Sequence, residues 1–65
     1  MTNTVKEQIL EVRDTGAVNM FDVHGVQRTA NSLDLLELVV YLNERENIRE
    51  YSRFILTGEA EITEA

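Results

Sequence analysis

Residues 33–42 constrain the fold most, because nearly every position in this segment is apolar. Only Asp34, Glu37 and Tyr41 interrupt the run, and their spacing of three and four places them on one narrow stripe of a helix. A helix that is apolar around the rest of its circumference has to be covered on more than one side. We therefore predict that this segment is the central helix of a small bundle, or that part of it forms a dimer seam.

The small size of the chain favours association with another chain. Its 65 residues suffice for one small domain, and such a domain buries only about 60% of the surface that its unfolded chain exposes. The chain contains no cysteine and one histidine, so disulfides and a zinc site are not available as supports. Tight helix packing and association remain, and we expect a homo-oligomer, most simply a dimer, or a partner-bound protein.

Three further segments show the three-and-four spacing of apolar residues that is typical of amphipathic helices. Together with 33–42, we predict helices over about residues 4–14, 23–30 and 47–57. For residues 54–57 the alternative is a short strand, because this segment contains mostly strand formers. The predicted fold class is all-α, a bundle of three to four short helices packed around the central apolar helix.

Local signals mark the ends of these helices. Thr4, Asp22 and Asn47 precede helical patterns and carry side chains that accept hydrogen bonds from free backbone N–H groups. Gly16 and Gly58 follow the first and last patterns and favour the left-handed conformation that ends helices. Each predicted boundary therefore has a local physical cause.

The segment after Gly58 is short and acidic. We expect a single helical domain over residues 1–58 and a disordered tail over 59–65. The N-terminal residues show no basic region followed by an apolar run, and no stretch has the roughly 18 apolar residues of a membrane helix. We therefore expect a cytoplasmic protein without a membrane segment.

The residues do not point to catalysis. His24 is the only histidine, and no nucleophile or orienting acid stands at a recognisable spacing from it. The three glycines are isolated, so no phosphate-binding loop is indicated, and the acidic residues are scattered. We predict no catalytic residue, no cofactor and no metal, and thus no enzyme.

DNA binding is the main alternative, because segments 23–30 and 33–42 have roughly the layout of a helix-turn-helix. The polar stripe of the second segment is acidic, however, and the net charge of the chain is -6. Acidic side chains repel phosphates, so a nucleic-acid partner is disfavoured.

An interaction module fits the residues better. Aromatic side chains dominate the binding energy of many interfaces, although core packing is the alternative explanation for each aromatic residue here. The candidate interface residues are Leu36, Val40, Tyr41, Tyr51 and Phe54.

A second candidate is a polar site, which consists of His24, Arg28, Arg45, Arg49 and Arg53. The last three arginines recur at steps of four and would form a positive ridge on one helix. Glu46 and Glu50 each lie three residues before an arginine, and ordinary surface pairing is the favoured interpretation.

Four segments resemble a family of short bacterial and phage or prophage proteins classed as a domain of unknown function. These segments are Asn19-Met20-Phe21-Asp22, Val26-Gln27-Arg28-Thr29-Ala30, Glu37-Leu38-Val39-Val40-Tyr41 and Glu50-Tyr51-Ser52-Arg53-Phe54-Ile55-Leu56-Thr57-Gly58-Glu59. The resemblance implies a small helical protein carried by mobile elements, and it supplies no activity or catalytic residue to transfer.

The hypothesis from sequence is therefore non-enzymatic binding. We expect a phage or prophage accessory protein that self-associates and binds a host or phage protein. The alternative is a small DNA-binding or transcription-modulating protein, and a third hypothesis is capture of a small ligand near Phe21, His24 and Gly25 at a subunit interface.

Overall fold

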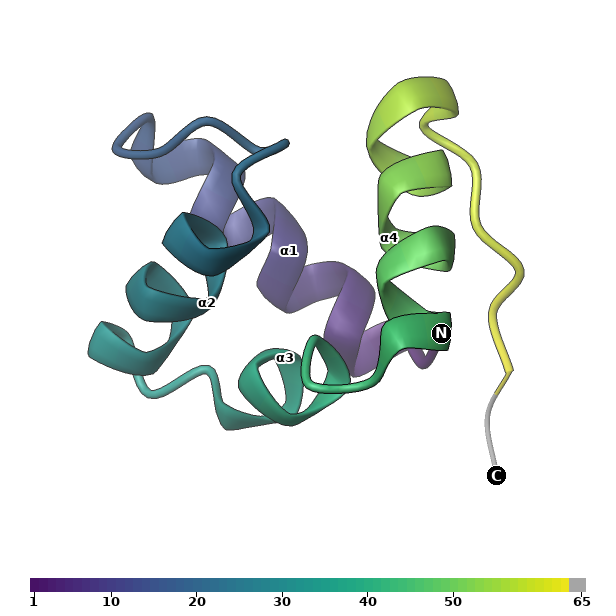
Figure 1. The fold of residues 1–65 in the computed structure, drawn as a ribbon, viewed down its shortest axis with the longest axis horizontal. Helices are drawn as coiled ribbons and strands as arrows, with labels where there is room; N and C mark the ends of the chain where they lie inside the picture. Colours follow the sequence, from purple (N-terminus) through teal and green to yellow (C-terminus); the bar gives the residue numbers. More distant parts are fainter. Residues whose placement is uncertain (64–65) are drawn as a thin grey trace.

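The protein is a bundle of four helices joined by short connections. The computed structural model describes residues 1–63. It contains α1 (Asn3–Thr15), α2 (Val23–Ser32), α3 (Leu36–Tyr41) and α4 (Arg45–Thr57), and the described residues include no strand (Figure 1). The predicted all-α class is confirmed, and residues 54–57 are helical.

Three helix ends lie where local signals place them. The Asp22 carboxylate accepts a hydrogen bond from the Gly25 N–H (3.0 Å) at the start of α2, as predicted. Gly16 and Gly58 end α1 and α4 with φ values of 64° and 75°. The cap of α1 is Thr2, whose hydroxyl accepts from the Val5 N–H (3.2 Å), so the prediction of Thr4 was wrong by half a turn.

The central segment is less helical than its apolar run suggests. Helix α2 continues to Ser32, and Asp34 then adopts a left-handed φ of 59°. This conformation interrupts a right-handed helix. Helix α3 is consequently only six residues long and begins at Leu36, not at residue 33.

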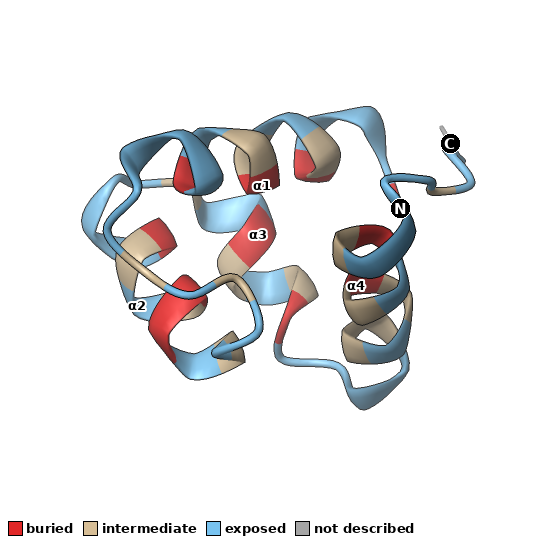
Figure 2. Ribbon diagram, turned by 90° about the horizontal axis from the view of Figure 1, so that it is seen from above, coloured by how far each residue is buried: buried red, intermediate tan, exposed pale blue. Residues whose placement is uncertain are grey.

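The core lies between the inner faces of all four helices (Figure 2). Helix α1 contributes Val5, Ile9 and Val12, whereas Leu38 is the buried residue within α3. Among residues 1–63, the buried apolar residues are Met1, Val5, Ile9, Val12, Val26, Ala30, Leu38, Leu42, Tyr51 and Phe54.

Helix α4 starts two residues before the predicted position. Asn47 was expected to cap it, but its side-chain amide instead donates to the Tyr41 carbonyl oxygen (2.9 Å). The helix packs through large side chains, since Tyr51 and Phe54 are both buried. The Tyr51 hydroxyl also donates to the Met20 carbonyl oxygen (2.5 Å), which joins α4 to the connection between α1 and α2.

Residues 59–63 are the described part of the segment expected to be a disordered tail, and they form no helix or strand. The segment runs back beside α4 (Figure 1), where the Met1 ammonium group donates to the Glu61 carbonyl oxygen (2.9 Å). The Thr63 N–H donates to the Met1 carbonyl oxygen (2.9 Å). These bonds hold the segment against the N-terminus, and the remainder of the predicted tail, residues 64 and 65, lies outside the described residues.

Candidate interaction site

An apolar groove lies between the start of α1 and the exposed side of α3. Its volume is about 410 Å³, and its lining residues are Thr2, Val5, Leu36, Glu37, Val40 and Tyr41. Leu36 and Val40 are 54% and 65% exposed. The groove therefore presents aliphatic side chains to solvent beside the buried Val5.

Two glutamines fix the short helix α3 that forms one wall of the groove. The Gln8 side chain accepts from the Leu38 N–H and donates to the Glu37 carboxylate, both at 2.9 Å. This satisfies a backbone donor at the start of a helix that has no side-chain cap. The Gln8 hydrogen bond is also the main reason that the pKa of Glu37 is lowered.

The second glutamine acts near the other end of α3. Gln27 on α2 donates to the Val39 carbonyl oxygen (2.9 Å) and to the Asn43 side-chain oxygen (2.7 Å). Helix α3 is therefore held by side chains from both α1 and α2.

Tyr41 connects the groove to α4. Its hydroxyl donates to the Glu50 carboxylate, and burial raises the pKa of the Tyr41 phenol. The pKa of Glu50 is lowered, chiefly because it accepts this hydrogen bond and also because the Met1 ammonium group lies 2.9 Å from the same carboxylate. The groove rim is thus tied to a polar cluster at the N-terminus.

Two of the five predicted interface residues belong to the core. Tyr51 and Phe54 are buried inside α4's contact with the rest of the chain, so they are not accessible to a partner. Burial raises the pKa of Tyr51 to about 12. Core packing, the alternative weighed for the aromatic residues, therefore explains both, whereas Leu36, Val40 and Tyr41 do line one groove.

The five residues of the predicted polar site do not come together. His24 and Arg28 are exposed on α2, whereas Arg45, Arg49 and Arg53 are exposed on α4, and the two helices lie on opposite sides of the molecule (Figures 1 and 2).

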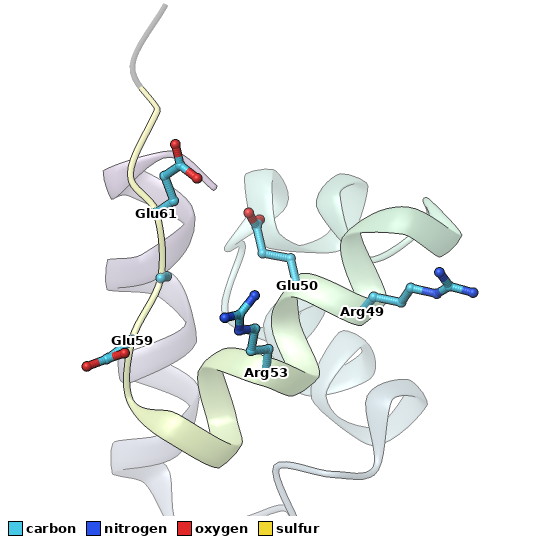
Figure 3. A pocket seen from close by; sticks show the side chains of 6 residues that line it. Arg49, Glu50, Arg53, Glu59 and Glu61 are labelled. Atoms are coloured by element: carbon cyan, nitrogen blue, oxygen red, sulfur yellow. The ribbon is translucent and has the colours of Figure 1, made fainter.

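A polar groove does lie between α4 and the C-terminal segment. It is lined by Arg49, Glu50, Arg53, Glu59, Ala60 and Glu61. Figure 3 shows the Arg53 side chain extending beside Glu50 and the Arg49 side chain pointing away from it. Among residues 1–63, neither arginine forms an ion pair, and Glu50 binds the Met1 ammonium group instead. The predicted pairing of these arginines with glutamates three residues earlier is therefore wrong.

The space expected for a small ligand near Gly25 is filled by the chain itself. A Cβ atom on Gly25 would lie 2.5 Å from the Asp22 carboxylate oxygen and 2.8 Å from the Val18 Cγ2. Gly25 is buried, and its lack of a side chain permits close packing of this turn. Phe21 and His24 are exposed on the outside of this turn.

Sequence reasoning missed the contribution of α1 to the groove. Thr2 and Val5 line it and Gln8 supports it, yet these residues lie about thirty positions before α3 in the chain. No local pattern indicates such a contact. In the described part of the chain, acidic and histidine side chains form no group able to hold a metal ion. No helix of residues 1–63 is long and apolar enough to cross a membrane.

The fold and the groove define a small all-helical domain that presents an apolar surface between two helices. The chain belongs to the family described as a domain of unknown function (DUF5049), which it matches over residues 1–59. Comparisons with curated proteins and with solved structures found no match. This match confirms the part of the resemblance that concerns a family of unknown function. It includes the first residue of the segment beside α4.

Proposed function

We propose that this chain is a non-enzymatic interaction protein that self-associates through the groove between α1 and α3 and, in that form, binds another protein. The observation that carries the proposal is the exposure of Leu36 and Val40 on a six-residue helix. Burying a large aliphatic side chain contributes about 1.5–3 kcal/mol, so a surface that covers both residues gains free energy. Two neighbouring exposed aliphatic side chains that line one groove support an interaction site there.

A second copy of the chain is the occupant that we propose for this patch, because two copies of the patch can cover each other. Leu36 and Val40 lie four residues apart, or about 6 Å along the helix axis. When two α3 helices pair about a two-fold axis, Leu36 of one copy faces Val40 of the other, and each patch covers its equivalent. The polar residues Thr2 and Glu37 then lie at the rim, where interfaces normally meet water.

The size of the groove limits the strength of this contact. Stable interfaces bury about 800 Å² per partner, a large share of the 4497 Å² exposed by this chain. The groove is lined by six residues, whereas a stable interface uses roughly 20–30 residues on each side. We therefore expect a weak dimer, with a dissociation constant between about 10 µM and 1 mM.

The biological setting belongs to the same proposal. The resemblance of four segments to phage and prophage proteins supports an accessory role in which the protein acts on a host or phage protein in the cytoplasm. Helix α3 contains Glu37 and no basic residue, so the observed surface gives no added support to DNA binding through this helix.

The test is the molar mass in solution at about 500 mM salt, which screens contacts between charged surfaces. It is measured by sedimentation from about 10 µM to about 1 mM. We expect the mass of the wild-type protein to rise toward that of a dimer, and the Val40→Glu and Leu36→Glu variants to remain folded monomers. Phe21→Glu is the matched control, because Phe21 is equally exposed (57%) but lies outside the groove. A wild-type monomer at all concentrations would refute self-association. Loss of the dimer in the control would refute the groove as the contact surface.

A further inference from the structure

The outer side of α4 carries a row of three arginines. Arg45, Arg49 and Arg53 are all exposed, and each lies four residues from the next. This spacing places them about 6 Å apart along one side of the helix. Among residues 1–63 none of them forms an ion pair. We call these three residues, with the exposed Leu56, the arginine ridge.

Leu56 helps to decide what kind of partner the ridge fits. It lies three residues after Arg53 on the same side of the helix and is 73% exposed. A nucleic-acid backbone would use the guanidinium groups but not this leucine. The combination favours an acidic protein surface that also offers apolar area.

The chain itself presents such a surface on α1. Glu7, Glu11 and Asp14 are exposed and follow each other at steps of four and three, so they share one side of that helix. Leu10 is half-buried beside them. The Glu7 and Glu11 carboxylates repeat at about 6 Å along the axis, which is the repeat of the arginines.

The two charged surfaces do not meet within one chain. Asp14 pairs weakly with its neighbour Arg13 (3.7 Å), and Glu7 accepts a hydrogen bond from Asn3 (3.2 Å). No ion pair between described residues joins α1 to α4. Opposite charges at the same repeat on two separate helices can therefore be satisfied between copies.

We infer that the arginine ridge of one copy docks on the acidic side of α1 of a second copy. This contact goes beyond the proposed α3 pairing and does not depend on it. It joins different surfaces of the two chains, so it is a heterologous contact that can extend to assemblies larger than a dimer. Because both surfaces are exposed to solvent, the contact weakens as salt screens the charges.

The test uses Val40→Glu chains, in which the α3 contact is removed, so that the two proposals fail independently. Sedimentation at about 1 mM protein is compared between about 50 mM and about 500 mM salt. We expect association at low salt that disappears at high salt. Adding either Arg49→Glu with Arg53→Glu or Glu7→Arg with Glu11→Arg should abolish it, and mixing these two variant chains should restore it.

The matched control is Arg28→Glu, compared with Arg49→Glu alone, because both single changes alter the net charge by the same amount but Arg28 is an exposed arginine on α2, outside both surfaces. We expect this control to retain the association. The inference is overturned if no salt-dependent association occurs, if the control loses it equally, or if the mixture stays monomeric. It is also overturned if the ridge binds a short DNA duplex and the chain shows no self-association, because the occupant would then be a polyanion.

Discussion

Helices α3 and α4 are both rich in apolar residues, yet they use them in opposite ways. Helix α4 has thirteen residues, buries Tyr51 and Phe54, and turns its arginines to solvent. Helix α3 has six residues, buries Leu38, and leaves Leu36 and Val40 exposed. The difference shows that apolar content alone does not place a residue in the core. A short helix has room for few inward positions, and its remaining apolar residues form a surface.

The largest effect expected from this comparison is on stability. Tyr51→Ala should lower the free energy of unfolding by about 3–5 kcal/mol, because it empties a fully buried site. Leu36→Ala should change it by less than about 0.5 kcal/mol in the monomer, because the side chain is half exposed. Urea unfolding followed by circular dichroism at low protein concentration measures both. Equal losses would show that Leu36 belongs to the core.

A smaller effect concerns alkaline pH. The folded state raises the pKa of Tyr51 to about 12, whereas a tyrosine in the unfolded chain ionises near pH 10. The folded protein therefore releases this proton less readily, and the stabilisation is complete below about pH 10 and is lost as the pH rises toward 12.

Tyr51→Phe should reduce the loss of stability at alkaline pH. It should also lower the free energy of unfolding by about 1 kcal/mol near neutral pH, because the hydrogen bond to the Met20 carbonyl oxygen is removed. The melting temperature from pH 7 to pH 11 is the measurement. Tyr41→Phe is the companion variant, since burial raises the pKa of Tyr41 as well. An unchanged alkaline loss in the double variant would contradict this assignment.

The smallest of these stability effects lies where the groove rim meets α4. Glu50→Gln removes the charge that binds the Met1 ammonium group, and it weakens the acceptor of the Tyr41 hydroxyl hydrogen bond. Because Glu50 is partly exposed, we expect the free energy of unfolding to fall by about 1 kcal/mol. Glu46→Gln, an exposed position on the same helix, should have almost no effect.

The contribution of Glu50 to the free energy of unfolding also depends on pH in the acid range. Its folded-state pKa lies below the ordinary value of 4.5, so the contribution is present above that value and declines as the pH falls through the folded-state pKa. Thermal unfolding between pH 3 and pH 7 should therefore show a smaller difference between wild type and Glu50→Gln at the acid end. A constant difference would mean that the charge of Glu50 is irrelevant.

The sequence predicted best what depends on neighbouring residues. Asp22, Gly16 and Gly58 act within one helical turn, so their roles at helix ends were readable. The helical period of residues 47–57 also placed Tyr51 on the inward side, although interface chemistry gave that residue a second interpretation.

The sequence could not predict contacts between distant segments. The Gln8 side chain satisfies the Leu38 N–H across thirty positions, and Glu50 binds Met1 in preference to Arg53. The left-handed Asp34 shortened α3 and decided which leucines face solvent. These choices depend on packing of the whole chain, so local spacing contains no signal for them.

The most direct measurement for the proposed α3 contact is a dilution series of methyl NMR spectra of the wild-type protein, from about 1 mM to about 20 µM. The series is recorded at about 500 mM salt, because salt suppresses contacts between charged surfaces. We predict that the methyl resonances of Val5, Leu36 and Val40 shift with concentration, whereas those of the buried Val12 and Val26 do not. If no resonance of the groove shifts, or if the largest shift belongs to Leu56 on α4, the groove is not the self-association surface and the proposal is wrong.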